Sequence, residues 1–160
     1  MTSQRFRAPG WRSIAIAALA ALALSLSATS AFAAVTAEPN ANLSKTAPTN
    51  VAVTGTEFKA GEKYWVGLCS KKTYGTFGIP ACGTMIEVTA DGSGQFSTSV
   101  TVQKTTANVH AGIPFPLNLG QPASFTCAGD PKVNDECQIA VAEHGGTKSI
   151  LGGKAVTFLE

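Results

Sequence analysis

The sequence predicts an all-β domain of the sandwich type that is exported and crosslinked by disulfides. Short runs rich in Val, Thr, Phe and Ile alternate with clusters of Gly, Pro, Asn and Asp, which is the pattern of a chain of short strands. No sustained apolar period of 3.6 residues follows the first 33 residues, so helix is a minor component. Four cysteines lie in two sequence-close pairs, Cys69 with Cys82 and Cys127 with Cys137.

Residues 1–33 have the layout of a cleavable signal peptide. Three arginines precede an apolar run over residues 14–26, and the small-residue sequence Ala31-Phe32-Ala33 follows it. A transmembrane helix is the alternative, but the run is shorter than the roughly 20 apolar residues that span a bilayer, and it is rich in Ala. We expect cleavage after Ala33 and secretion of residues 34–160 as one domain, free in the medium or held at the cell wall.

The charge balance changes once the expected leader is removed. Three of the 12 basic residues lie in the leader and all ten acidic residues follow it, so residues 34–160 carry nine positive and ten negative charges, a net charge of −1. Lys71-Lys72 is the one pair of adjacent basic residues, which a solvated loop explains. This balance gives no electrostatic basis for tight binding of nucleic acid.

Four cysteines in an exported chain predict two disulfides, and sequence alone allows three connectivities. Short loops close easily, which favours the local pairs Cys69–Cys82 and Cys127–Cys137. A zinc site is the alternative use of four cysteines, but there is no Cys-x-x-Cys spacing, and His110 and His144 lie at neither pair. We therefore expect disulfides and no metal site.

Eight segments are predicted to be strands, because β-branched and aromatic residues in each are bounded by turn residues. The first is a candidate edge strand, and seven evenly spaced strands after it favour a β-sandwich. The segments are 34–37, 50–54, 64–69, 85–89, 95–102, 124–127, 138–142 and 155–159.

Two connections between these strands are informative. Asp91-Gly92-Ser93-Gly94 has the composition of a tight turn and predicts a hairpin between the two strands on either side of it. Residues 104–122 form the longest irregular piece, which three prolines interrupt. An irregular segment of this length calls for a functional explanation.

Strand parity predicts an open face on the sheet, because successive side chains of a strand point to opposite sides. The residues that suit a core are Tyr64, Val66, Leu68, Ile139 and Val141. The second face contains Trp65, Gly67, Cys69, Gln138, Ala140 and Ala142. Its small residues leave room for a flat ligand, although a β-bulge at Gly67 and edge packing of the alanines would explain them equally well.

The residues themselves resemble the neocarzinostatin family of actinobacterial chromoproteins, in order and over nearly the whole of residues 34–160. The resemblance implies an immunoglobulin-like seven-stranded antiparallel sandwich or barrel with two disulfides, and a cleft that holds a reactive enediyne chromophore. The motifs that carry it are Val51-Ala52-Val53-Thr54-Gly55, Ala60-Gly61, Tyr64-Trp65-Val66-Gly67-Leu68-Cys69, Ala81-Cys82, Val88-Thr89-Ala90-Asp91, Ser97-Thr98-Ser99-Val100-Thr101-Val102, Cys137-Gln138 and Ala155-Val156-Thr157-Phe158.

The resemblance can be carried onto individual positions. Gly67, Cys69, Gln138 and Gly153 match residues that the family uses around its ligand. The predicted ligand-binding residues are Trp65, Gly67, Cys69, Met85, Phe115, Leu117, Gln138, Ala140, Ala142 and Gly153.

Several positions depart from the family pattern. Trp65 stands where the family's name-giving protein has an acidic residue, Lys71 where it has a tryptophan, Met85 where it has a phenylalanine, and Ala142 where it has a serine that binds the ligand. We infer that the cleft is kept and that its ligand is different or lost.

Two segments could supply walls for the cleft. Within residues 104–122, four apolar residues alternate with other residues and would share one face of an extended ribbon, either lining the cleft or packing as core. Tyr74 and Phe77 lie at the expected hairpin tip between the first two cysteines and could form a lid. The four alternating residues are Ile113, Phe115, Leu117 and Leu119.

Two functions from different classes remain open. The first is a secreted, monomeric carrier of a hydrophobic chromophore of enediyne type. In this hypothesis the ligand, and not the protein, acts on DNA and carries any antibiotic activity. The second is an exported immunoglobulin-like interaction module at the cell surface. An enzyme is not predicted, because neither histidine has a carboxylate or nucleophile in a catalytic pattern.

Overall fold

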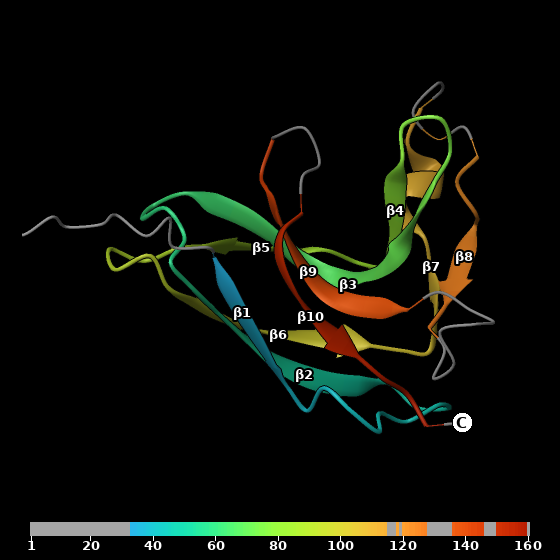
Figure 1. Ribbon diagram of the computed structural model, residues 1–160, viewed down its shortest axis with the longest axis horizontal. Coiled ribbons are helices and arrows are strands. Elements are labelled where there is room, and N and C mark those ends of the chain that lie inside the picture. Colours follow the sequence, from blue (N-terminus) through green and yellow to red (C-terminus); the bar gives the residue numbers. More distant parts are fainter. Residues whose placement is uncertain (1–32, 115–117, 119, 128–135, 146–149, 160) are drawn as a thin grey trace, which may run out of the picture.

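The computed structural model of the protein describes residues 33–114, 118, 120–127, 136–145 and 150–159. These residues form two antiparallel sheets packed face to face, together with a small ribbon and one short helix (Figure 1). The expected leader lies outside the described residues apart from Ala33, so its cleavage stays a prediction.

The smaller sheet has three strands in the order β1-β2-β6. Its strands are β1 (Ala34–Glu38), β2 (Thr49–Thr56) and β6 (Phe96–Val102). Alternate residues of β2 and β6 are buried, among them Val51, Val53, Val100 and Val102, while the Ser and Thr residues between them face outward. Alternation with a period of two is what turns one face of each strand toward the core.

The larger sheet has the order β10-β9-β3-β4, with β5 also paired to β3. Its strands are β3 (Lys63–Tyr74), β4 (Ile79–Cys82), β5 (Ile86–Thr89), β9 (Cys137–Glu143) and β10 (Ile150–Val156). The long strand β3 pairs with β5 along its first half and with β4 along its second half. The β3–β4 hairpin therefore projects beyond the two packed sheets (Figure 1).

A ribbon of β7 (Thr105–Ala107) and β8 (Ser124–Thr126) lies beside this hairpin, with the 3-10 helix η1 (Val109–Gly112) after β7. Asn108 is the N-cap of η1, and its side chain accepts a hydrogen bond from the amide of His110. This cap holds the start of η1 in place.

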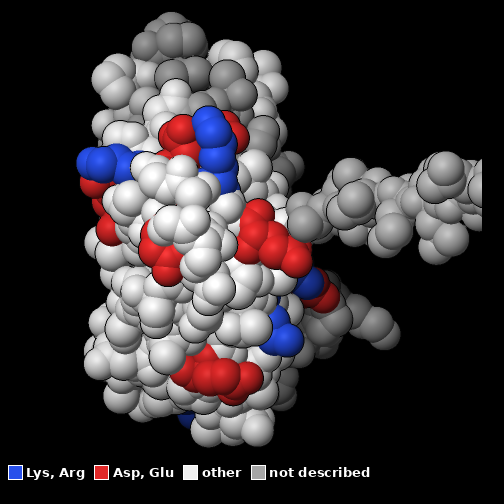
Figure 2. All heavy atoms as spheres, turned by 90° about the vertical axis from the view of Figure 1, so that its left-hand side faces the viewer, with Lys and Arg blue, Asp and Glu red and all other residues white. Residues whose placement is uncertain are grey.

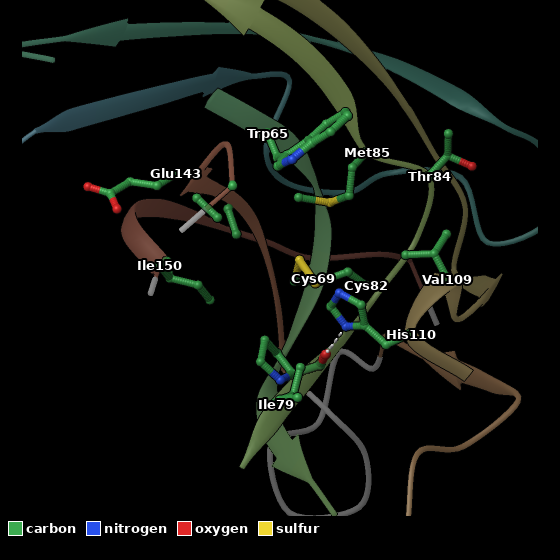
Figure 3. Close-up of a pocket in the computed structure, with 14 residues that line it drawn as sticks. Trp65, Cys69, Ile79, Cys82, Thr84, Met85, Val109, His110, Glu143 and Ile150 are labelled. Carbon is green, nitrogen blue, oxygen red and sulfur yellow. Dashed lines mark hydrogen bonds between the residues drawn. A yellow bond between two sulfur atoms is a disulfide. The ribbon is translucent and has the colours of Figure 1, made fainter. Parts of the chain in front are cut away.

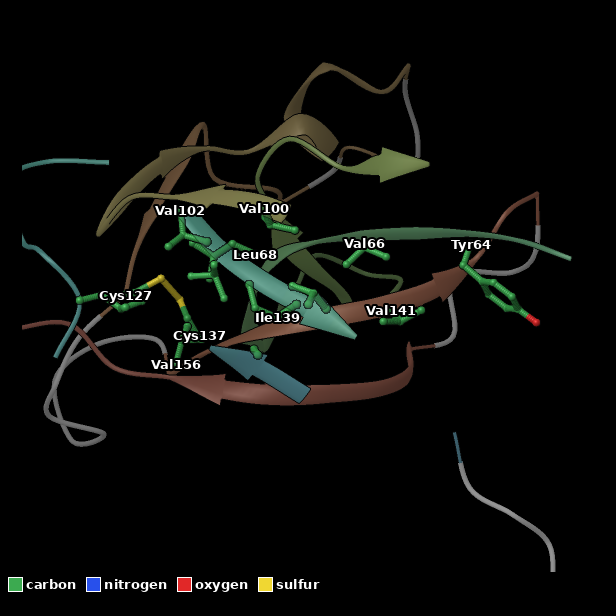
Figure 4. Packing of buried hydrophobic residues seen from close by; sticks show 14 of the residues in the cluster. Tyr64, Val66, Leu68, Val100, Val102, Cys127, Cys137, Ile139, Val141 and Val156 are labelled. Atoms are coloured by element: carbon green, nitrogen blue, oxygen red, sulfur yellow. A yellow bond between two sulfur atoms is a disulfide. The ribbon is translucent and has the colours of Figure 1, made fainter. Parts of the chain in front are cut away.

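The core lies between the two sheets (Figure 4). Val66, Ile139 and Val141 have no exposed surface, and Leu68 is 3% exposed. The predicted parity of β3 and β9 is therefore confirmed for the core face. The disulfide Cys127–Cys137 is buried in the same cluster, and the local pairing of both disulfides is also confirmed.

The predicted sandwich is confirmed, but several boundaries differ. β3 continues to Tyr74, and β4, β7 and η1 were not predicted. β10 begins at Ile150, well before the predicted residues 155–159, because Gly152 and Gly153 lie inside it. A side chain at Gly153 would come within 2.7 Å of Gln138 Oε1 and 3.0 Å of the Ile139 carbonyl, so these glycines serve close packing and not a turn.

The predicted hairpin around Asp91 is wrong, because β5 pairs with β3 and β6 pairs with β2. The turn itself forms, with the Asp91 amide donating to the Gln95 carbonyl, but it passes from one sheet to the other. Backbone groups next to the turn are hydrogen-bonded to the loop before β3. The Phe58 amide donates to the Gly94 carbonyl, and the Ala90 amide donates to the Glu62 carbonyl.

The Asp91 carboxylate is expected to make the stability of this crossing acid-sensitive. Its Oδ1 accepts hydrogen bonds from the Ser93 hydroxyl (2.7 Å), the Ser93 amide (2.8 Å) and the Gln95 amide (3.0 Å), which lower the Asp91 pKa below its ordinary 3.8. A lowered pKa adds stability that is present above the ordinary value and is lost as the pH falls through the folded value. The Tm of Asp91→Asn should therefore lie below that of the wild type near neutral pH, and the gap should close in acid.

Thermal melts from about pH 6 to about pH 2 check this expectation. Glu38→Gln is the control, since Glu38 is an exposed carboxylate with no side-chain hydrogen bond among the described residues. A gap for Asp91→Asn that stays constant over the whole range contradicts the assignment.

Candidate functional site

A cleft of about 490 Å³ lies on the face of the larger sheet that points away from the core (Figure 3). β3 and β9 supply its floor, and β4, η1 and the segment before β5 supply one side. The described residues that line it are Trp65, Cys69, Ile79, Pro80, Cys82, Thr84, Met85, Val109, His110, Ala140, Ala142, Glu143, Gly145 and Ile150.

Three small residues lie in register across the sheet face that bears the cleft. Gly67 on β3 pairs with Ala140 on β9, which pairs with Gly153 on β10. The pairing of β3 with β9 is regular from Tyr64 to Ser70, so Gly67 does not mark a bulge. Met85 lies over Gly67, since a Cβ at that position would be 2.5 Å from the Met85 sulfur.

The wall opposite β9 is held by buried polar contacts. Asn108 is 5% exposed and accepts a hydrogen bond from the Cys82 amide (3.1 Å), while its Nδ2 donates to the Pro122 carbonyl (2.9 Å). The His110 ring nitrogen Nδ1 is 2.8 Å from the Pro80 carbonyl. Satisfied buried polar groups of this kind fix the segment around η1 against β4.

One end of the cleft is aromatic and charged. The Trp65 ring stacks on the His144 ring, with centroids 4.9 Å apart and planes at 27°. The His144 Nε2 lies 2.7 Å from a Glu87 carboxylate oxygen, and the other oxygen accepts from Lys63 Nζ at 2.6 Å. The hydrogen bond from Lys63 and, to a lesser degree, the charges of Lys63 and His144 hold the pKa of Glu87 below its ordinary 4.5.

The predicted ligand-binding residues divide into three groups. Trp65, Cys69, Met85, Ala140 and Ala142 are brought together in the lining of the cleft. Gly67, Gln138 and Gly153 belong to the same sheet face but do not line the cleft: Gly67 is buried beneath Met85, Gln138 is half-buried and Gly153 is exposed. Phe115 and Leu117 lie outside the described residues, as does Leu119, so their predicted places in the wall stay predictions.

Sequence reasoning missed the lining residues of β4, η1 and the start of β10. Ile79, Val109 and Ile150 are apolar residues beside turns, and nothing in their local pattern distinguishes a cleft wall from a loop. The proposed lid at the hairpin tip does not contact the cleft: Phe77 is 53% exposed, and Tyr74 is covered by the Lys72 ammonium 5.2 Å from its ring. The length of residues 104–122 was the one signal that pointed toward η1.

The charged residues give no assembled catalytic or metal centre in the described ranges. His144 does have a carboxylate partner, Glu87, which sequence reasoning missed because the two residues lie far apart along the chain. No hydroxyl or thiol of a described residue is hydrogen-bonded to either histidine, and no three described metal-ligating side chains gather at one point. No helix among these residues has the length and apolar character needed to cross a membrane.

The charged residues do not form a basic surface on the face that Figure 2 shows: acidic and basic residues are scattered among wide uncharged areas, and several acidic residues have no basic neighbour. Among the described residues, Lys59 pairs with Glu62 (2.8 Å) and Lys63 pairs with Glu87 (2.6 Å). Each of these pairs neutralises a lysine locally.

Comparison with known proteins places the chain. It is similar to the solved structure of macromomycin, with a TM-score of 0.59 and 24% identity over 79% of this chain and 99% of that chain. It is also similar to the solution conformation of apokedarcidin, with a TM-score of 0.51 and 22% identity over 80% of this chain and 99% of that chain. At these identities the likeness shows the fold alone.

No curated protein matches the chain by sequence. A model of the neocarzinostatin family matches residues 35–150, which contain both disulfides, the residues that line the cleft and the strands from β1 to β9 apart from Ala34. The chain therefore belongs to the neocarzinostatin family.

Proposed function

We propose that the protein is a secreted, non-enzymatic carrier that binds and shields a hydrophobic small molecule of the enediyne-chromophore type in this cleft. The cleft itself is the observation that carries the proposal. Its volume of about 490 Å³ is within the range of small-molecule sites, roughly 300–1,000 Å³, and most of its lining residues are apolar. Membership of a family of chromophore carriers supports the same role.

The carrier would act by exclusion of water and thiols. The apolar floor and the walls from β4 and η1 would surround a reactive group, and the few polar groups at the rim would orient it. Any action on DNA, including antibiotic activity, would belong to the released ligand, since the net charge of residues 34–160 is −1. The protein would work as a monomer outside the cell, after removal of residues 1–33.

The ligand would differ from that of the family's name-giving protein. Trp65, Met85 and Ala142 line the cleft, and each departs from the family pattern at its position. Native mass spectrometry of protein purified cold and in the dark from its own host tests the proposal. A non-covalent adduct of several hundred daltons that is removed by organic extraction would support it. A clean mass for residues 34–160 would favour the interaction module instead.

Trp65→Ala is expected to weaken binding of an apolar probe without unfolding the domain. The indole is half-buried at the end of the cleft and is not part of the core cluster, so its removal costs ligand contact area and not core packing. Titration with N-phenyl-1-naphthylamine, an uncharged dye that fluoresces in apolar sites, should show affinity lower by about tenfold.

Leu159→Ala is the matched control for this variant, because Leu159 is 49% exposed and lies outside the cleft. Circular dichroism should be the same for both variants and the wild type. Equal dye affinity in all three proteins would remove Trp65 from the proposed site.

A further inference from the structure

Four side chains at one end of the cleft lie on the same face of the larger sheet. Trp65 on β3 is directly opposite Glu87 on β5 and opposite Ala142 on β9. His144 follows Ala142 by two residues, and Lys63 precedes Trp65 by two, so strand parity turns both toward the same side. The backbone fixes this placement, since the His144 amide donates to the Lys63 carbonyl at 3.2 Å.

These side chains form a chain of contacts that ends on Trp65. Lys63 Nζ is 2.6 Å from one Glu87 oxygen, His144 Nε2 is 2.7 Å from the other, and the His144 ring stacks on the indole at 4.9 Å. Glu87 thus bridges an ammonium group and an imidazole, and the imidazole is held at both its ring face and its Nε2. A ring held in this way restrains the aromatic ring stacked on it.

We propose that His144, held by Glu87, is a positioning residue for Trp65, and that the stacked pair is a preorganised shelf for an uncharged planar aromatic group of the ligand. The inference rests on the proposed carrier function and specifies which part of the ligand is recognised here. A half-buried indole that is already ordered loses little conformational freedom when a ligand stacks on it, which favours binding.

The contact with Glu87 decides how firmly the shelf is held. A carboxylate oxygen 2.7 Å from the imidazole Nε2 fixes the plane of that ring, and the indole stacked on it keeps a nearly matching plane. A flat, uncharged aromatic group is the ligand part that can stack on an indole ordered in this way.

Other charged groups around His144 are already paired or lie at the rim. Glu87 faces it from β5, and Lys63 faces it from the start of β3. Lys59 and Glu62 border the same surface hollow of about 300 Å³ from the loop before β3, and they pair with each other at 2.8 Å. Glu143, the adjacent residue on β9, borders both this hollow and the cleft. Glu87 is therefore the direct charged partner of the imidazole.

The first test needs no ligand. Trp65 is the single tryptophan of residues 34–160, so the anisotropy of its emission at one fixed pH reports how freely this indole moves. His144→Gln should lower the anisotropy, because the indole loses the ring stacked on it, and Glu87→Gln should lower it by a smaller amount. Glu62→Gln breaks a comparable exposed ion pair away from Trp65 and should leave the anisotropy unchanged.

The second test is binding of N-phenyl-1-naphthylamine at the same fixed pH. His144→Gln should bind the dye on the order of threefold more weakly than the wild type. His144→Phe keeps a stacked ring and should bind the dye as tightly as the wild type. This pattern separates positioning of the indole from a general loss of stability, which thermal melts of each variant monitor.

Each outcome has one meaning. Wild-type values of emission anisotropy and dye affinity in His144→Gln would overturn the inference while leaving the carrier proposal intact. Absence of dye binding in the wild type would overturn both the carrier proposal and the shelf. A lowered anisotropy in His144→Gln, together with tight dye binding by His144→Phe, would establish the positioning role.

Discussion

Replacing all four cysteines with alanine is expected to lower the free energy of unfolding by about 6 kcal/mol, because each disulfide contributes about 3 kcal/mol in the chain-entropy model. The two bridges span sequence separations of 13 and 10 residues. A domain of this size has a total stability of about 5–15 kcal/mol, so the variant without the four cysteines should be largely unfolded at 37 °C. Urea denaturation followed by circular dichroism measures the loss.

The two disulfides should differ in what else they change. Cys127–Cys137 is buried in the core cluster, whereas Cys69–Cys82 lines the cleft. Cys69→Ala/Cys82→Ala should therefore lose dye affinity as well as stability, and Cys127→Ala/Cys137→Ala should lose stability with its affinity kept. Each double variant serves as the control for the other. If the free energy of unfolding of the variant without the four cysteines lies within about 1 kcal/mol of the wild-type value, the chain-entropy account is contradicted.

Gly67→Ala is expected to obstruct the cleft from its floor. A Cβ there would lie 2.5 Å from the Met85 sulfur and 2.9 Å from the Thr84 carbonyl oxygen, and both distances are far below ordinary contact. The Met85 side chain can move, but it must move into the cleft that it lines, and the Thr84 backbone must shift as well. We expect a loss of about 1–3 kcal/mol in stability and about tenfold in dye affinity.

Gly92→Ala is the matched substitution, since a Cβ at Gly92 meets no atom within 4 Å. It should leave both stability and dye affinity at wild-type values. If Gly67→Ala also keeps wild-type stability and dye affinity, then the position of Met85 does not require a glycine at residue 67. The described shape of the cleft floor would then not control binding.

The core could be predicted from the sequence because its signal is local. Val66 and Leu68 are separated by Gly67, and Ile139 and Val141 are separated by Ala140, so strand parity alone places each apolar pair on one face of its strand. The floor of the cleft follows from the same parity taken on the opposite face. Family resemblance added the immunoglobulin-like type of the sandwich and the expectation of an enediyne chromophore in the cleft.

What could not be predicted depends on contacts between distant segments. Asp91 to Gly94 has the composition of a hairpin turn, but the loop before β3 bonds to the backbone beside it, so the chain crosses to the other sheet. Gly152 and Gly153 suggest a turn and instead lie within β10. The pairing of His144 with Glu87 requires knowing that β5 and β9 flank the same strand.

One edge of β3 pairs with two different strands, and this has a consequence for how the protein can diverge in evolution. Its first half, paired with β5, belongs to the packed sandwich, while its second half, paired with β4, contributes a cleft wall and few core residues. Insertions or deletions near Gly75 and Gly78 would lengthen or shorten that wall with little loss of stability, because long surface loops cost little extra entropy. Ligand choice can therefore drift under selection while the scaffold stays constant, and the same hairpin is the place to diversify the protein by library design.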